Sequence, residues 1–217
     1  FGETSVEAML YRFTAREVHW KSLLTLSGLN ILPRHVMATQ DFNKVNFEFP
    51  VVSGLYRIEV TSGPGGGVKI LNQPTPPPFR ESVKVGEQNL YTRAKELVGD
   101  RDPREHEFSI QMRATDADKT GNGLGLAVLV ALCGSLLGKN TRGGTIVVGS
   151  LNLGGSLELV PNPIRIAELA VDKQAQTLLM PVASRRHLVD LPDDMWTRIN
   201  VEFYKDAGDA VFKALVD

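Results

Sequence analysis

The chain has one cysteine among its 217 residues, and this residue, Cys133, lies within an uncharged apolar stretch. A lone cysteine excludes an intramolecular disulfide framework and a thiolate metal cluster. Because unpaired cysteines in apolar surroundings are usually core residues, we interpret Cys133 as structural rather than nucleophilic. The four histidines, at positions 19, 35, 106 and 187, show no metal-ligand spacing. We therefore expect no metal site.

An excess of charge of either sign is also missing. The chain has 24 Lys and Arg residues against 25 Asp and Glu residues, which gives a net charge of −1. This balance provides no overall electrostatic footprint for nucleic acid, so any such contact would need a local patch of positive charge. Apolar residues make up 42% of the sequence and charged residues 23%, as in a globular protein with a sizeable core.

The sequence has no apolar run long enough for a bilayer. Its longest uncharged stretch, 124–137, falls short of the roughly 20 residues that a membrane-spanning helix requires. No signal peptide is apparent, so we expect a cytoplasmic protein without a membrane partner. The chain begins at Phe1 rather than at methionine, and we expect it to be a piece of a longer protein.

The sequence is organised around residues 121–138, which read GNGLGLAVLVALCGSLLG. Three alternating glycines open this stretch, and a run without charged residues follows. The pattern predicts a helix that is buried on all sides, preceded by a tight turn that comes close to its neighbours. Many active sites are framed by such a turn.

The rest of the chain alternates between strand and helix patterns. Residues 1–30 predict a helical arm, which is either an ordinary helix packed on the domain or a connector to a missing preceding domain. Alternating residues predict strands at 45–49, 56–60 and 68–71, the last two joined as a hairpin through the glycine turn 63–67. Further expected elements are a helix at 80–98, a strand at 106–114, a strand from 145 that continues through 151 and 153, a helix from Pro163, strands at 177–181 and 199–204, a short helix from Ser184, and a helix at 207–216 capped by Asp206. This order predicts an α/β fold with partly parallel pairing.

Several motifs, taken in order, resemble those of the proteolytic domain of Lon-type ATP-dependent proteases. Residues 118–127 (DKTGNGLGLA) resemble the segment in which Lon reads Pro-Lys-Asp-Gly-Pro-Ser-Ala-Gly. Residues 148–155 (VGSLNLGG) are similar to its Thr-Gly-Glu-Ile-Thr-Leu-Arg-Gly run, and residues 80–82 resemble its Lys-Glu-Ser. The first strand pair, residues 178–181 and the turn at 190–192 also fit. Residues 148–155 and the ending 203–215 are most similar to the Lon-related family of bacterial BREX phage-defence systems.

The resemblance implies a fold and a division of the chain. The fold is α/β (α+β) and ribosomal-protein-S5-domain-2-like, with helices packed on a mixed parallel and antiparallel sheet. Residues 1–50 would form a helical arm and first strand at the junction with a missing AAA+ ATPase domain, and residues 51–217 the Lon-like domain. The implied partners are copies of the same chain in a hexamer-like ring, the AAA+ domain, and double-stranded DNA. ATP and Mg²⁺ would be bound in the AAA+ domain, and this fragment would hold no cofactor.

Lon-type proteases use a Ser–Lys dyad, and the resemblance places its two positions on residues without the required chemistry. The serine falls on Gly123, which has no side chain. The lysine falls on Ile164, or on Arg165 if the register shifts by one. Isoleucine has no basic group, and arginine stays protonated at neutral pH. We therefore predict a pseudo-protease.

The competing hypothesis is an active ATP-dependent Lon-type serine peptidase, a hydrolase with an atypical catalytic site. Thr120 and Lys119, on the same loop as Gly123, are weak substitute candidates for the dyad. Ser135, Ser150 and Ser156 are further hydroxyls, and Lys139 and Lys173 further amines, in the same part of the sequence. If DNA is contacted, the cations that must gather on one surface include Arg80, Lys84, Arg93, Arg101, Arg104, Arg185 and Arg186.

Overall fold

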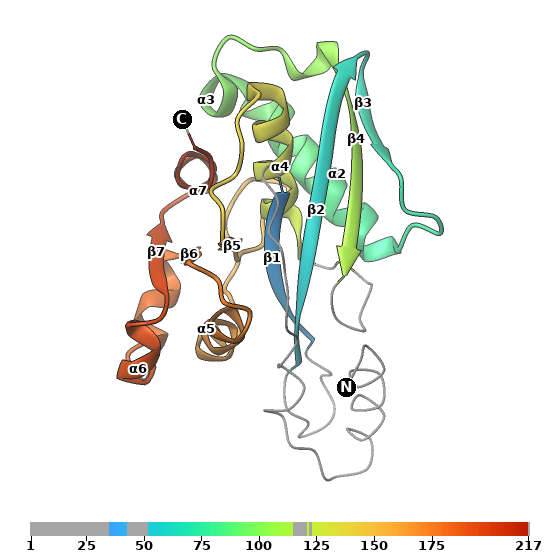
Figure 1. Ribbon diagram of the computed structural model, residues 1–217. Helices are drawn as coiled ribbons and strands as arrows, with labels where there is room; N and C mark the ends of the chain where they lie inside the picture. The colour runs from blue at the N-terminus through green and yellow to red at the C-terminus, as the bar shows by residue number, and fades with distance from the viewer. Residues whose placement is uncertain (1–34, 43–51, 115–120, 122, 217) are drawn as a thin grey trace.

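The computed structural model describes residues 35–42, 52–114, 121 and 123–216 (Figure 1). The predicted arm at 1–30 and the predicted strand at 45–49 lie outside these residues. The strands are β1 (His35–Phe42), β2 (Val52–Pro64), β3 (Gly67–Ile70), β4 (His106–Ala114), β5 (Thr145–Val147), β6 (Thr177–Pro181) and β7 (Asn200–Tyr204). The helices are α2 (Pro77–Thr92), α3 (Ala94–Val98), α4 (Gly125–Leu137), α5 (Pro163–Asp172), α6 (Asp193–Trp196) and α7 (Ala207–Ala214), with short 3₁₀ turns η2 (Pro103–Glu105) and η3 (Val182–His187).

The strands form one sheet in the order β3-β4-β2-β1-β5-β6-β7. β2 pairs antiparallel with β1 and with β4, whereas the pairs β3–β4, β1–β5, β5–β6 and β6–β7 are parallel. Six strands therefore run in one direction and β2 runs against them. The prediction of an α/β fold with a mixed sheet is confirmed.

The predicted hairpin between residues 56–60 and 68–71 is wrong. β4 lies between β2 and β3 and pairs with both. The glycine turn does reverse the chain, but its Gly65 N–H donates to the Glu105 carbonyl at the entry to β4 rather than closing a ladder with β3. The turn thus spans the width of one strand. Periodicity within each strand does not reveal a partner that comes 40 residues later.

Other expected elements differ in their bounds, and two of them differ through a break or an early end. The helix predicted at 80–98 starts earlier, at Pro77, and is broken at Arg93, whose non-helical backbone (φ −117°, ψ 23°) separates α2 from α3. The strand predicted to continue through Leu151 and Leu153 ends at Val147, and Leu151 instead forms a bridge with Leu157. The residues after β5 therefore make a small hairpin of their own.

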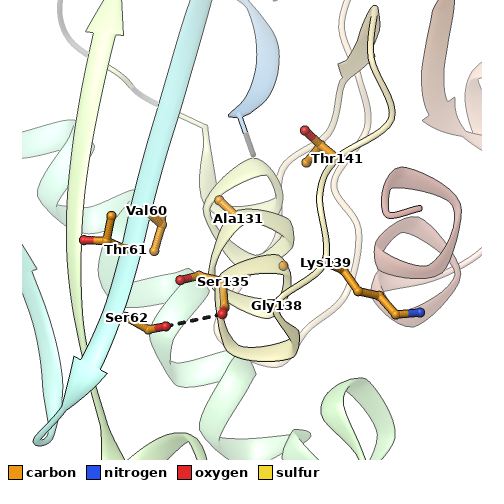
Figure 2. A pocket seen from close by; sticks show the side chains of 9 residues that line it. Val60, Thr61, Ser62, Ala131, Ser135, Gly138, Lys139 and Thr141 are labelled. Atoms are coloured by element: carbon orange, nitrogen blue, oxygen red, sulfur yellow. Dashed lines mark hydrogen bonds between the residues drawn. The ribbon is translucent and has the colours of Figure 1, made fainter. Parts of the chain in front are cut away.

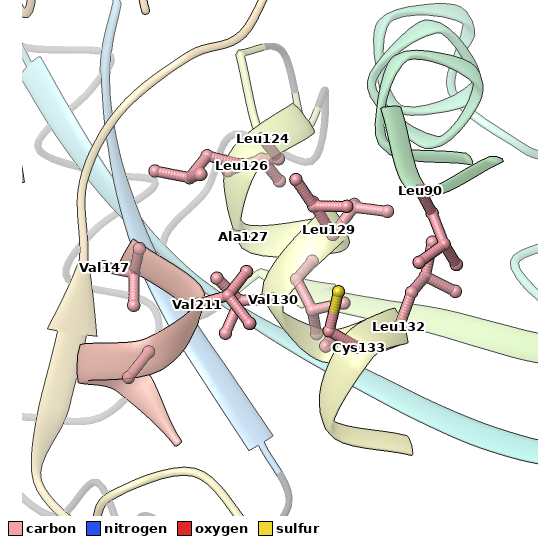
Figure 3. Packing of buried hydrophobic residues seen from close by; sticks show 14 of the residues in the cluster. Leu90, Leu124, Leu126, Ala127, Leu129, Val130, Leu132, Cys133, Val147 and Val211 are labelled. Carbon is pink, nitrogen blue, oxygen red and sulfur yellow. The ribbon is translucent and has the colours of Figure 1, made fainter. Parts of the chain in front are cut away.

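The predicted fully buried helix is confirmed as α4. It packs between the sheet, α2 and α7, and among its residues Leu126, Leu129 and Leu132 have no exposed surface (Figure 3). The helix ends at Gly138, which adopts the left-handed conformation common after a helix C-terminus. Gly86 allows α2 to approach closely, because a Cβ there would lie 2.7 Å from Val128 Cγ1. Small residues at such a contact are required sterically.

The core is divided between the two faces of the sheet. Tyr56, Val147 and Leu179 belong to the cluster that contains α4, together with residues of α2 and α7. Their chain neighbours, including Leu55 and Ile146, belong to a second cluster, which contains residues of α5. Because successive side chains of a strand point to opposite faces, α4 and α5 cover opposite faces of the sheet.

The side chain of Tyr204, at the end of β7, holds the backbone that directly follows β5. Its buried hydroxyl donates to the Val148 carbonyl at 2.6 Å, and burial raises the pKa of this phenol well above its usual value. Gly149 follows with φ +152°, and a Cβ there would lie 2.0 Å from the Tyr204 hydroxyl. A glycine is therefore needed where the chain passes Tyr204.

No helix in the described ranges has the length and hydropathy to cross a membrane.

We predict that Tyr204→Phe lowers the free energy of unfolding by about 1–3 kcal/mol, because the buried Val148 carbonyl loses its side-chain donor. Chemical denaturation monitored by circular dichroism measures this loss. Tyr91→Phe is the matched control, since this tyrosine is partly exposed, and its effect should stay within about 0.5 kcal/mol. Equal stability of the two variants would contradict the assignment.

Candidate functional site

The loop that leads into α4 contains the position that the Lon resemblance assigns to the nucleophile. Gly121 and Gly123 both have left-handed backbone conformations, with φ of +64° and +69°. Gly121 is buried, and a Cβ on it would lie 2.3 Å from the sulfur of Met112. Gly123 is half-buried and directly precedes Leu124, the residue that flanks the first turn of α4. Residues other than glycine rarely adopt either of these backbone conformations.

Ser82 of α2 closes this loop. Its buried hydroxyl donates to the Gly121 carbonyl at 3.0 Å and accepts a hydrogen bond from the Leu124 N–H at 3.2 Å. One side chain thus joins the residues on either side of Gly123. Ser82 belongs to the Lys-Glu-Ser-like run at 80–82, but that resemblance does not reveal this role. A serine on the inner side of an otherwise apolar helix face was the available signal.

The two alternatives for the lysine position lie in the first turn of α5. Ile164 packs against the second core cluster. The Arg165 guanidinium forms an ion pair with Glu168, with Nη1 and Oε2 2.5 Å apart. Burial raises the pKa of the neighbouring Asp172, while the positive charges of Arg165 and Arg198 act against this rise. Neither residue at the lysine position provides a neutral amine.

The two assigned positions follow the same end of the sheet, the one formed by the carboxyl ends of its parallel strands. α4 follows the carboxyl end of β4, and the segment that leads to α5 follows the carboxyl end of β5, which runs parallel to β4. β2 and β1 lie between these two strands. The two helices then diverge to opposite faces of the sheet. Open α/β sheets commonly bind ligands at this end.

The hairpin of residues 150–158 is held against α2 near the same end of the sheet. The amide of Asn89, which is 1% exposed, donates to the Val85 carbonyl at 2.9 Å and to the Asn152 carbonyl at 3.1 Å. Arg93 donates to the Gly154 carbonyl at 3.3 Å. Asn89 is a second residue whose role the sequence did not reveal, since its partner is 63 positions away.

The substitute dyad candidates Thr120 and Lys119 lie outside the described residues. Ser135 and Lys139 line one cavity of about 330 Å³ between β2 and the C-terminal half of α4. Figure 2 shows the Lys139 side chain extending away from Ser135. The Ser62 hydroxyl, in the same cavity, donates to the Ser135 backbone carbonyl at 3.3 Å. The cavity therefore brings together no serine hydroxyl and amine as a dyad.

The remaining candidates are spread over other elements. Lys173 is buried at the end of α5, about 14 Å along the helix axis from Ile164 at a rise of roughly 1.5 Å per residue. Ser156 is exposed on the hairpin, and Ser150 is half-buried at its base. None of the described residues gather into a group of three or more His, Cys, Asp or Glu side chains that could hold a metal.

The cations considered for DNA contact divide between two sides of the sheet. Arg80 and Lys84 are exposed on α2, whereas Arg185 and Arg186 are exposed on η3. Several of the others have partners within the chain, because Arg101 donates to the Leu136 carbonyl and the Arg104 guanidinium lies 5.6 Å from the centre of the Tyr91 ring. Arg80 and Lys84 are four residues apart and therefore share one side of α2.

A family model described as the Lon protease (S16) C-terminal proteolytic domain matches residues 52–217. The Lon-like protease BrxL of Escherichia coli O9:H4 (strain HS) is 30% identical over 167 residues, which are 76% of this chain and 24% of that protein. BrxL of Bacillus cereus (strain H3081.97) is 32% identical over 92 residues, which are 42% of this chain and 14% of that protein.

A Lon protease is similar over the same length. The enzyme named Lon protease from Methylocella silvestris is 28% identical over 167 residues, 76% of this chain and 20% of its own length. The chain thus spans about a quarter or less of the length of these relatives. Because the family model covers most of the sequence and the sheet has the expected mixed topology, the chain belongs to the Lon protease C-terminal proteolytic domain family.

Proposed function

We propose that this chain is the Lon-like C-terminal domain of an AAA+ ATP-dependent protein and that it has lost peptide hydrolysis. In this role the domain assembles a ring and forms part of the passage for the substrate. The observation that carries the proposal is the loop at Gly123, where the assigned nucleophile position has neither a side chain nor a backbone conformation suited to one. The similarity to two proteins named Lon-like protease BrxL supports the placement among Lon relatives.

The chemistry of acyl transfer supports the loss of hydrolysis. A Ser–Lys dyad needs a hydroxyl oxygen to attack and a neutral amine to accept its proton. Gly123 supplies no oxygen, and Ile164 supplies no base. Arg165 is positively charged and paired with Glu168 at 2.5 Å. The nucleophile position thus lacks an attacking oxygen, and the lysine position lacks a neutral amine to accept its proton.

Exposed apolar side chains on and beside a fixed hairpin support assembly. Leu153, which is 66% exposed, lies on the hairpin that Asn89 and Arg93 hold against α2, and Leu159, which is 75% exposed, directly follows it. Exposed apolar groups that are presented rigidly favour contact with another surface, because little conformational entropy is lost on binding. In a ring, ATP and Mg²⁺ would be bound by the AAA+ domain, and duplex DNA would be the substrate that the ring encloses. The BREX resemblance makes phage defence the process in which such a ring would act.

We predict that Gly123→Ser does not create a peptidase. At φ +69° a serine costs about 1–2 kcal/mol of stability, and no lysine stands at the partner position. Peptide hydrolysis by the full-length protein with ATP, and labelling by a covalent serine-directed inhibitor, should both be absent in the wild type and the variant. Gly143→Ser is the control, because Gly143 is exposed with open space around its Cβ position. It should leave stability unchanged.

Hydrolysis of casein by the wild-type full-length protein would favour the alternative function, an active peptidase. If Thr120→Ala or Lys119→Ala then abolished that activity, the atypical site would be established and the proposed loss of hydrolysis would be wrong.

We predict that replacing both Leu153 and Leu159 by Asp reduces the fraction of full-length protein that sediments as a ring. The reason is that charged side chains would have to be desolvated at the contact. Analytical ultracentrifugation with ATP measures the assembled fraction. Leu71→Asp is the control, since this leucine is 55% exposed but lies outside the hairpin. A wild type that stays monomeric at all concentrations would contradict ring assembly itself.

We predict that duplex DNA binds the full-length protein with an affinity that falls steeply as salt rises. Arg80→Ala combined with Lys84→Ala should reduce the slope of log K against log salt by about 2, because each contacted phosphate contributes roughly 0.9. The control pair is Arg185→Ala with Arg186→Ala, from the other side of the sheet, and it should leave the slope unchanged. Absence of binding at low salt would remove DNA from the proposal.

A further inference from the structure

β7 forms one outer edge of the sheet. Among the described strands, β7 has one neighbour, β6. The Asn200 N–H donates to the Gln176 carbonyl at 3.0 Å, and the parallel register pairs Leu178 with Val201. In a parallel ladder, alternate residues direct both backbone groups to the same neighbour. The backbone groups of Val201, Phe203 and Lys205 therefore face away from β6.

Two of these outward groups are bound by an ion pair of α7. The Lys213 ammonium donates to the Phe203 carbonyl at 2.5 Å. The Asp209 carboxylate accepts a hydrogen bond from the Lys205 N–H at 3.0 Å. The two side chains are themselves joined, with Lys213 Nζ and Asp209 Oδ2 3.0 Å apart. The pair thus links a carbonyl and an N–H that lie two residues apart on the strand.

This arrangement matches what a further strand would provide. In a parallel ladder, one residue of the added strand donates its N–H to residue i−1 and accepts from the N–H of residue i+1. For i at Tyr204, these are the Phe203 carbonyl and the Lys205 N–H. We propose that the Asp209–Lys213 pair replaces one residue of an eighth strand and thereby closes the sheet to strand pairing with a second copy of the chain.

The pair is positioned firmly enough for this role. Asp206 caps α7 by accepting the Asp209 N–H at 2.8 Å, so the helix starts at a fixed place beside β7. Asp209 and Lys213 are four residues apart and lie on the same side of the helix. Although burial alone would raise it, hydrogen bonds from Lys213 and the Lys205 amide hold the pKa of Asp209 below its usual value. The carboxylate is therefore charged at neutral pH.

The chemistry of edge protection agrees with this reading. Unpaired strand edges are templates for association with another chain, and a lysine at the edge is a common means of preventing it. Here the lysine does more than add charge, because it occupies the acceptor that an incoming strand would use. The inference does not rest on the proposed ring function, since the edge would be closed in a monomer as well.

The test uses amide hydrogen exchange and sedimentation of the 217-residue chain. In Asp209→Ala, exchange of the Lys205 amide should accelerate by about tenfold or more, because its charged acceptor is removed. In Asp209→Ala with Lys213→Ala, species larger than those of the wild type should appear and grow with concentration. Lys213→Met keeps the apolar stem and the carboxylate, so it should retain protection of Lys205 even if the alanine variants fold poorly.

The matched control removes the Lys69–Glu107 pair, whose ends are 2.7 Å apart, between β3 at the opposite edge of the sheet and β4. Lys69→Ala with Glu107→Ala deletes the same charges and should leave both the Lys205 exchange rate and the sedimentation profile as in the wild type. An unchanged Lys205 exchange rate in Asp209→Ala would overturn the proposal. So would a double variant at α7 whose sedimentation profile matches that of this control.

Discussion

Burial of α4 on every side is the constraint on which the rest of the structure depends. The helix has no charged residue, and the sheet, α2 and α7 together cover nearly all of it, with only Ser135 and Leu137 half-buried. This requires α2 to approach closely, which Gly86 permits, and it fixes α2 alongside the first turns of α4. The loop before α4 then has little room, and the buried Gly121 against Met112 follows directly from that packing.

The same constraint shapes the candidate site. Once α2 lies beside α4, Ser82 reaches both the Gly121 carbonyl and the Leu124 N–H, and Asn89 reaches the hairpin after β5. These restraints all act on backbone groups. None of them uses a side chain at position 123 or 164, so the architecture of the site is independent of the groups that a Ser–Lys dyad would supply. A domain built in this way keeps its shape without a functional side chain at either position.

Local signals in the sequence predicted the elements that local interactions determine. The apolar run at 124–137, the alternation at 106–114, the cap at Asp206 and Pro163 at the start of α5 all appear in the structure. The pairing of β4 between β2 and β3 was missed because it joins segments distant in the chain. Ser82 and Asn89 were missed for the same reason, since a polar residue on a helix does not reveal which loop it will bind.

The two outer strands of the sheet, β7 and β3, are protected by side chains in different ways. α7 follows β7 directly, and side chains from its first two turns reach two of the strand's outer backbone groups. In α7 the residues at these turns are Asp209 and Lys213, which supply one acceptor and one donor in the spacing of a ladder. The opposite edge strand, β3, instead has Lys69 paired with Glu107 of its neighbour, a contact between side chains. The ion pair of α7 therefore occupies two backbone groups of the β7 edge, whereas the Lys69–Glu107 pair adds charge at the β3 edge without occupying a backbone group. This difference makes β7 the edge at which removal of a single ion pair would alter how the sheet meets another chain.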